Sequence, residues 1–441
     1  MPQRIGSIVT IALGISVAVL DGTIANVALP SIADDLQISA GASIWIVNSY
    51  QLVVTMTLLS LSSLGDIVGY RRIYQTGLLV FSCMSLLCAL SGSLLTLTIA
   101  RVLQGIGASA LMSVNTALIR LIFPKAKLGR GMALNAIVVA ISAAAGPTIA
   151  GVILSFASWQ WLFAINIPIG ITSLYLSFRY LPNNDSKNTH CFDGMSAILN
   201  ALTFGLFFIA ITGFSHNQFI GYVLSELLLA LIIGYFFVRR QLKNPFPLLP
   251  IDLLRIPIFS LSICTSICSF CAQTLAMVSI PFYFQRTLGL SETETGLLLT
   301  PWPIATILFA PLSGRLVEKI HAGILGAIGM LIFSAGLYSL ALLSGTPTYL
   351  NISLCMMICG AGFGLFQSPN NQTIMSSAPR NRSGGASGML GTARLIGQTS
   401  GATIVALLFN SYAVEGTHVS LMSAGALALI ACFISGLRWK A

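Results

Sequence analysis

The sequence predicts an all-α polytopic membrane protein with fourteen transmembrane helices, and three observations support this fold class. Hydrophobic residues make up 56% of the 441-residue chain and charged residues only 8%, whereas a soluble protein carries roughly 25% charged residues. Fourteen spans of about 20 residues would use about 280 residues and leave only short loops. Lysine and arginine gather on one side of the resulting topology. A water-soluble enzyme is therefore excluded.

The apolar segments predict the helices in order. Six spans are expected in the first part of the chain: 5–29, 44–64, 73–92, 95–118, 132–156 and 160–181. Two more are expected at 194–213 and 219–238, and a last six at 257–283, 294–314, 321–343, 350–375, 386–411 and 418–437. The first segment is too long to be a cleaved signal peptide. We expect an N-terminal bundle at 1–181, a linker with two inserted helices at 182–255, and a C-terminal bundle at 256–441.

The basic residues predict the orientation. With the N-terminus in the cytoplasm, 19 of the 22 lysines and arginines fall on the cytoplasmic side, and the exceptions are Arg101, Arg286 and Arg394. This distribution follows the positive-inside rule. It predicts a cytoplasmic (inner) membrane protein with both termini in the cytoplasm. The net charge of +10 reflects this orientation, and nucleic acid is not expected as a partner.

The cysteines indicate packing rather than chemistry. Eight of the nine lie inside apolar segments, and Cys191 lies in a loop. Cys264, Cys268 and Cys271 have helical spacing, but no histidine or carboxylate accompanies them. Small buried side chains are the favoured interpretation, because zinc sites combine cysteine with histidine or further cysteines in a fixed set of four. No metal, cofactor or structural disulfide is expected.

A weak internal repeat divides the chain. Leu64 and Asp66, at the end of the second span, align with Leu316 and Glu318, at the end of the tenth, with an offset of 252 residues. The same offset moves the first span onto the ninth. Transporters commonly contain such repeats. We therefore expect two parallel six-helix halves, with 194–238 inserted between them.

The loop after the second span carries an acidic–glycine–basic pattern of Asp66, Gly69, Arg71 and Arg72. Together with the six-plus-six repeat, this pattern resembles the loop signature of the major facilitator superfamily and implies the major facilitator fold. Ser62 stands where that signature usually has a glycine. The resemblance implies that the Asp66 carboxylate faces a helix N-terminus, that a nearby arginine holds it, and that the loop favours one arrangement of the halves. The alternative is a set of solvated loop charges.

Three further motifs indicate which members of this superfamily the chain resembles. The fourth span contains Arg101-Val102-Leu103-Gln104-Gly105-Ile106-Gly107, which resembles a signature of proton-coupled members. The fifth span contains Gly146, Pro147 and Gly151, which resemble a motif associated with antiporters, although an ordinary packing kink at the proline is the alternative. The stretches 20–30 and 159–170 resemble the fourteen-helix drug:proton antiporters, the EmrB/QacA subfamily that includes methyl viologen exporters.

Three ionisable residues stand out at membrane depth: Asp21, Arg101 and Glu226. Charges at this depth cost at least ~2.5–3.5 kcal/mol each and usually mark ion or substrate paths. Asp21 and Arg101 lie at similar depth in the first half, so we expect a pair that couples transport to protons. The alternative is a purely structural ion pair. Glu226 lies in the inserted helices near a membrane boundary, where it can reach water or pair locally.

The expected substrate cavity is apolar, with scattered amides and aromatic rings. Few fixed polar groups suit a permissive pocket, and aromatic faces attract organic cations. Packing contacts are the alternative role for each residue. The candidates are Asn48, Tyr50, Gln51, Gln104, Asn115, Gln273, Trp302, Gln367, Asn370 and Asn371.

These observations predict a proton-coupled antiporter that exports lipophilic, chiefly cationic, toxic compounds and acts as a monomer in the lipid bilayer. A cation and a proton at Asp21 would compete. No nucleotide-binding loop Gly-x-x-x-x-Gly-Lys-Ser/Thr occurs, so the proton gradient is the expected energy source. A proton-coupled symporter that imports a small metabolite is the alternative, and the Gly146-Pro147 motif argues against it. A membrane-embedded enzyme is disfavoured because no paired catalytic carboxylates or metal ligands occur.

Overall fold

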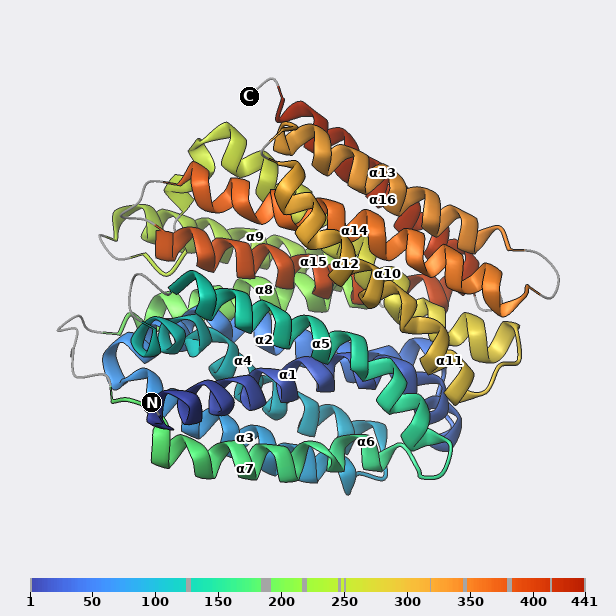
Figure 1. Ribbon diagram of the computed structural model, residues 1–441, viewed down its shortest axis with the longest axis horizontal. Helices are drawn as coiled ribbons and strands as arrows, with labels where there is room; N and C mark the ends of the chain where they lie inside the picture. Colours follow the sequence, from blue (N-terminus) through green and yellow to red (C-terminus); the bar gives the residue numbers. More distant parts are fainter. Residues whose placement is uncertain are drawn as a thin grey trace.

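The computed structural model describes residues 2–123, 128–183, 192–215, 220–244, 247–249, 251–317, 319–343, 347–378, 383–412 and 415–439. Within these ranges the chain forms helices and turns without a strand. Most of the long helices run across the molecule in Figure 1, with both chain ends near the same side. The all-α polytopic fold class is therefore confirmed.

The N-terminal helices are joined by short connections. They are α1 Pro2–Asp35, α2 Ala40–Val68, α3 Tyr70–Ala89, α4 Leu94–Ile122, α5 Leu128–Leu154, α6 Gln160–Ala164 and α7 Asn166–Tyr180. Gly69 alone separates α2 from α3, and its φ of 108° favours glycine. The expected span 160–181 is interrupted at Ile165. Pro168 explains this break, because proline has no N–H to donate to the carbonyl of Ala164.

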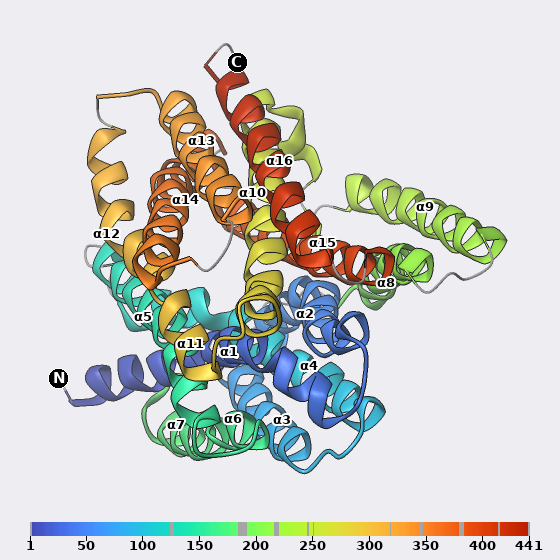
Figure 2. The same cartoon turned by 90° about the vertical axis from the view of Figure 1, so that its right-hand side faces the viewer.

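Two helices connect the bundles: α8 Gly194–Ser215 and α9 Ile220–Lys243. They pack against each other, and α8 also contacts α2 and α15. Asn200 Nδ2 donates to the Met56 carbonyl over 2.8 Å, which fixes α8 against α2. Figure 2 shows α9 projecting away from both bundles. The pair therefore lies at the periphery of the molecule.

The C-terminal part begins with the short 3-10 helix η2 and contains a π-helical turn, η3, after α10. Its elements are η2 Ile251–Arg255, α10 Pro257–Phe282, η3 Tyr283–Thr287, α11 Glu292–Leu299, α12 Pro301–Leu316, α13 Ala322–Ala341, α14 Tyr349–Ser377, α15 Ser383–Ser411 and α16 Gly416–Leu437. The expected span 294–314 is divided at Thr300, directly before Pro301, because proline has no N–H to donate to the carbonyl of Leu297.

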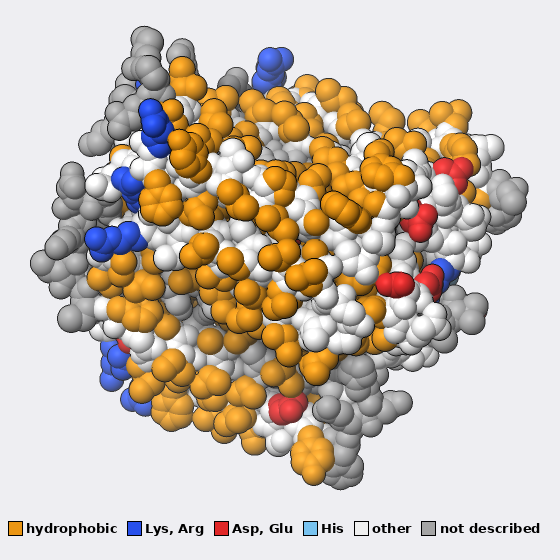
Figure 3. Space-filling model, turned by 90° about the horizontal axis from the view of Figure 1, so that it is seen from below, with side chains coloured by type: hydrophobic (Ala, Val, Ile, Leu, Met, Phe, Trp, Pro, Cys, Tyr) orange, Lys and Arg blue, Asp and Glu red, His pale blue; other side chains and the backbone are white. Residues whose placement is uncertain are grey.

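Thirteen segments of the described chain are long and apolar enough to cross a membrane, with α6–α7 and α11–α12 each counted as one. The remaining expected span corresponds to the 29-residue α15, which contains Arg394 and Gln398. Hydrophobic side chains cover the middle of the surface in Figure 3. The protein is therefore a multi-pass membrane protein.

Charged side chains separate to the two ends of the helices. In Figure 3 lysine and arginine gather at one end, and most of the visible aspartate and glutamate lie toward the other. We call the end that carries Arg71, Arg179 and Arg240 the basic end. The opposite end, with Asp34 and Glu292, is the acidic end.

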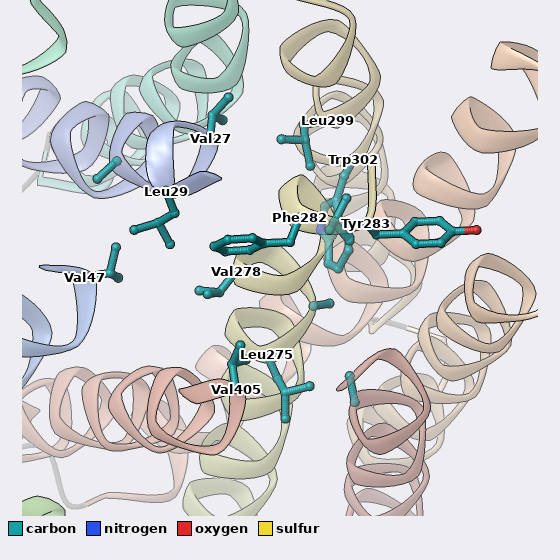
Figure 4. Packing of buried hydrophobic residues seen from close by; sticks show 14 of the residues in the cluster. Val27, Leu29, Val47, Leu275, Val278, Phe282, Tyr283, Leu299, Trp302 and Val405 are labelled. Carbon is teal, nitrogen blue, oxygen red and sulfur yellow. The ribbon is translucent and has the colours of Figure 1, made fainter. Parts of the chain in front are cut away.

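The two bundles are in contact at the acidic end. Ser31 Oγ donates to Glu292 (3.2 Å), and Arg286 pairs with Asp34 (2.7 Å). Figure 4 shows apolar side chains of α1, α2, α10, α11 and α15 converging nearby, among them Val27, Leu299 and Val405. We call the two polar contacts, with the packing of α5 on α11, the acidic-end seal.

Candidate proton-coupling site

The structure pairs Asp21 of α1 with Arg101 of α4. Arg101 Nη1 lies 2.5 Å from Asp21 Oδ2, and the side chains are only 1% exposed. Ser93 and Thr96 form a capping box at the start of α4, which fixes the first turn of the helix. Arg101 follows about two turns later. The pair expected from the sequence is therefore present, and its role in coupling stays a proposal.

The Asp21 carboxylate accepts two further hydrogen bonds. Gln104 Nε2 donates to Oδ1 over 3.1 Å, and Asn166 Nδ2 donates to the same oxygen over 2.8 Å. The three donors come from α4 and α7. Every buried oxygen of this carboxylate thus has a partner, as a buried charge requires.

Arg101 is held from several directions. Nη1 also donates to Gln104 Oε1 (2.6 Å), and Nε donates to the Ile46 carbonyl of α2 (3.2 Å). The guanidinium carbon lies 4.2 Å from the ring centroid of Tyr50 and 5.5 Å from that of Phe163. The arginine therefore connects α1, α2 and α4 through one planar group.

Gln104 bridges the two charges, because its Oε1 faces Arg101 while its Nε2 faces Asp21 and also donates to Ser85 Oγ (2.8 Å). Gln104 and Tyr50 were expected to line the cavity, and the structure places them in this ionic cluster. Among the described residues, Tyr50 Oη and Asn166 Oδ1 are buried without a hydrogen-bond partner. Unpaired buried polar atoms mark places for water or ligand.

The switch-loop residues lie where α2 ends and α3 begins. Tyr70 donates to Asp66 Oδ1 over 2.6 Å. Arg71 instead donates to Asn183 Oδ1 (2.9 Å) and to the Phe178 carbonyl (2.6 Å). Arg72 is exposed. Among the described residues no arginine forms an ion pair with Asp66, and the expected contact with a nearby arginine stays a prediction.

The glycines of the antiporter motif bring α5 close to its neighbours. A Cβ on Gly146 would lie 2.0 Å from Thr23 Oγ1, and one on Gly151 would lie 2.9 Å from the Glu292 carbonyl oxygen. Thr293 Oγ1 donates to the Gly151 carbonyl over 3.1 Å. The helix continues through Pro147. Gly151 thus belongs to the acidic-end seal between α5 and α11, whereas Gly146 approaches α1.

The remaining cavity candidates divide into enclosed and partly exposed residues. Trp302 is 1% exposed and packs on Phe333, and Asn370 is 0% exposed. The C-terminal bundle encloses both side chains, and their role at a substrate cavity stays a prediction. Asn48 bonds Thr403 of α15 (3.1 Å), and Asn115 donates to Asn135 Oδ1 (2.9 Å). The partly exposed candidates are Gln51, Gln273, Gln367 and Asn371.

Sequence reasoning missed three side chains. Asn166 lies at the start of α7. The available signal was a polar amide within an otherwise apolar span. Arg438, expected at the cytoplasmic surface, is 1% exposed and donates to Asn370 Oδ1 over 2.6 Å. Arg394 was placed in a helix but was not counted among the membrane charges, although it has no ion-pair partner in the described chain. Glu226 lies on the peripheral α9, and its Oε2 lacks a partner among the described residues.

Comparison with known proteins places the chain among transporters. It is 62% identical over 439 residues (99% of this chain, 96% of the other) to a protein of Escherichia coli (strain K12) named uncharacterized transporter YebQ. It is 32% identical to the riboflavin transporter RibZ of Clostridioides difficile (89% and 86% covered). It is 28% identical to the multidrug resistance protein Stp of Mycobacterium tuberculosis (90% and 74% covered).

A solved transporter structure has a similar fold. A crystal structure of the peptide transporter POT in complex with sulfate superposes with a TM-score of 0.75 at 15% identity, covering 98% of this chain and 94% of that one. The family model described as Major Facilitator Superfamily matches residues 11–402. The chain belongs to the major facilitator superfamily and is a transporter rather than an enzyme.

Proposed function

We propose that the protein is a proton-driven exporter of lipophilic small molecules, of the drug:proton antiporter (EmrB/QacA) type. The observation that carries this proposal is the buried cluster of Asp21, Arg101, Gln104 and Asn166. Asp21 is the one carboxylate enclosed in the described helical bundles. Membrane-embedded ionisable groups of this kind mark proton relays.

Protonation of Asp21 supplies the coupling step. A proton bound to a carboxylate oxygen removes the negative charge, so Arg101 loses its ion-pair partner at 2.5 Å. Arg101 and Gln104 also hold α2 and α3 through Ile46 and Ser85. The contacts among four helices therefore differ between the protonated and the ionised state, and a difference in contacts is what shifts a two-state equilibrium.

Alternating access supplies the transport step. The acidic-end seal closes the bundles at one end, and the positive-inside rule assigns the basic end to the cytoplasm. We take the structure as the state closed toward the outside. Opening of this seal, with closure at the basic end, releases substrate outward while a proton enters.

The nature of the cargo is proposed from the relatives and the interior. One relative is named for multidrug resistance and another for riboflavin transport, and both names are compatible with aromatic compounds. The sequence predicts a preference for cations. Because Arg101 already neutralises Asp21, we propose lipophilic cargo without a requirement for positive charge.

Everted membrane vesicles with an acidic interior test this function. Addition of an exported compound outside should dissipate the pH gradient, because each molecule that enters releases a proton. The alternative is an importing symporter, and the relative named riboflavin transporter is compatible with it. Such a symporter would dissipate the pH gradient only when substrate is present in the lumen. Gradient loss that needs luminal substrate would contradict the proposed export.

A further inference from the structure

Arg394 lies in the middle of the membrane-spanning part of α15. It follows the first residue of α15, Ser383, by 11 positions, which is about 17 Å along a helix. Neither end of α15 is therefore within easy reach of the guanidinium. An arginine at this depth is expensive and is normally paired.

No described residue compensates the charge of Arg394. The three ion pairs of the described chain involve Arg101, Arg240 and Arg286. Arg394 Nε is buried without an acceptor among the described residues, and the guanidinium carbon lies 5.5 Å from the ring centroid of Phe270. Arg101, by contrast, has a carboxylate, an amide and a carbonyl as partners. Arg394 thus lacks the contacts of a structural arginine.

Arg394 lies on the side of α15 that faces α10, where it is half-buried beside Phe270. Thr399 and Thr403 bond α2, through Thr55 (3.1 Å) and Asn48 (3.1 Å). Gly397 and Gly401 sit against the backbone of α10. Arg394 precedes Gly397 by three positions and Gly401 by seven, so it belongs to the same stripe of α15, and the half-buried Gln398 lies one turn from it.

The α2–α15 contact also presents a spare amide. Leu395, next to Arg394, packs in a cluster with Tyr50 and Val54 of α2, so this level of α15 lies at the boundary between the two bundles. One turn before Thr55, Gln51 of α2 has a buried Oε1 without a partner among the described residues. Side chains with unused hydrogen-bonding atoms therefore occur on both sides of the boundary between the bundles, Gln51 on α2 and Arg394 on α15.

We propose that Arg394 binds an acidic group of the transported lipophilic compound: a carboxylate, sulfonate or phosphate. The planar guanidinium matches such groups with two parallel hydrogen bonds, and the ring of Phe270 offers apolar contact beside it. Asp21 and Arg101 neutralise each other, whereas the positive charge of Arg394, near the middle of α15, has no described carboxylate to compensate it. A lipophilic acid supplies the missing negative charge.

This inference rests on the proposed export function and adds an electrical consequence. Export of a monovalent anion in exchange for one entering proton moves two positive charge equivalents inward. The membrane potential then drives transport together with the pH gradient. A monovalent cation exchanged for one proton would move no net charge.

Transport in proteoliposomes of 2-naphthoate, its uncharged amide 2-naphthamide and tetraphenylphosphonium tests the proposal. The wild-type protein should take the carboxylate with a KM at least tenfold below that of the amide. Arg394→Gln should raise the KM for the carboxylate at least tenfold and change that of the amide less than twofold. Arg394→Lys should have a KM for the carboxylate between those of the wild type and Arg394→Gln, because lysine keeps the positive charge but lacks the planar fork of N–H donors. Arg239→Gln, at an exposed position on α9, is the matched control and should behave as wild type.

Each contrary result has a distinct meaning. An Arg394→Gln protein that loses carboxylate and amide transport equally would overturn the anion site, and so would a wild-type protein that prefers tetraphenylphosphonium or does not take up the carboxylate. If Arg394→Gln fails to fold, the KM of Arg394→Lys for the carboxylate and the preference of the wild-type protein for carboxylate over amide test the anion site instead. Failure of the export function is separate: transport of all three probes would then be insensitive to an imposed pH gradient.

Discussion

At the residue scale, the planar geometry of one arginine organises the buried cluster. Arg101 Nη1 reaches both Asp21 and Gln104, while Nε reaches the Ile46 carbonyl. A lysine ammonium is a point charge that cannot reproduce this fork. Buried ion pairs add little to stability compared with apolar replacements, so the cluster is better explained by a role in transport than by a role in folding.

Arg101→Lys should therefore keep the fold and the charge but reduce proton-driven transport at least tenfold. The lysine can pair with Asp21, but it removes the guanidinium N–H groups that donate to Gln104 Oε1 and to the Ile46 carbonyl. Initial rates of ΔpH-driven uptake into vesicles measure the effect, with thermal unfolding as the check on folding. Arg239→Lys is the control, and rates equal to wild type in Arg101→Lys would refute the importance of the fork.

Gly69 is a second residue whose identity is required by its position, here by the backbone conformation between α2 and α3. Its φ of 108° and ψ of 133° lie in a region that side chains rarely adopt, although a Cβ there would meet no atom within 4 Å. Gly69→Ala should destabilise the protein by about 1–3 kcal/mol through backbone strain alone. Thermal unfolding in detergent measures this. Gly92→Ala is the control, because Gly92 also has no atom within 4 Å of a Cβ but, unlike Gly69, has no positive φ. It should unfold at the same temperature as the wild type. Equal unfolding temperatures for the two variants would contradict the strain argument.

At the element scale, the packing of α5 on α11 determines whether the acidic end is closed. Gly151 and Gly296 face each other so closely that a Cβ on Gly296 would lie 2.3 Å from the Pro147 carbonyl oxygen. Contacts this short between helices require glycine. The closed state thus depends on two small residues.

Gly151→Leu should push α5 from α11 and shift the protein toward a state open at the acidic end. Distances between spin labels on the outer ends of α5 and α11 should lengthen, and net transport should fall at least tenfold. Gly436→Leu, at a glycine of α16 with nothing within 4 Å, should change neither. Unaltered distances in Gly151→Leu would show that the glycine does not control the seal.

The inserted helices are joined by a clamp at the basic end. Arg240 Nη2 lies 2.9 Å from Asp193 Oδ1, and Ser196 N donates to the same carboxylate at the start of α8. Partial burial raises the pKa of Asp193, but hydrogen bonds from Arg240 and Ser196 outweigh this and lower it to about 2. Because the unfolded pKa is about 3.9, the stabilisation is complete above that pH and is lost as pH falls through about 2.

Asp193→Ala should accordingly cost about 1 kcal/mol as a lost helix cap, and the cost should be the same from pH 5 to pH 8. Thermal unfolding at several pH values measures this. Transport should remain, since α9 lies at the periphery. A cost that changes within this pH range would show that Asp193 titrates there, contrary to its lowered pKa.

At the scale of the whole molecule, hydropathy and charge predicted the helices because each span must be apolar and each loop must reach water. Depth along the helix was sufficient to predict the contact of Asp21 with Arg101. Rotation of a helix about its axis was not predictable, because apolar residues surround most spans on all sides. The enclosure of Trp302 and Asn370 in the C-terminal bundle was therefore not predicted, and Asn166 was missed. The breaks at Ile165 and Thr300 follow from prolines that the hydropathy pattern does not register.

The central claim is that protonation of Asp21 couples the proton gradient to transport. The most direct test compares uphill accumulation with substrate exchange in proteoliposomes that contain the wild-type or the Asp21→Asn protein. The Asp21→Asn protein should retain exchange of substrate for substrate but lose accumulation driven by the pH gradient, because asparagine mimics a permanently protonated carboxyl. Glu226→Gln, the matched carboxylate change on the peripheral α9, should retain both. Accumulation by Asp21→Asn in response to the pH gradient would contradict the account.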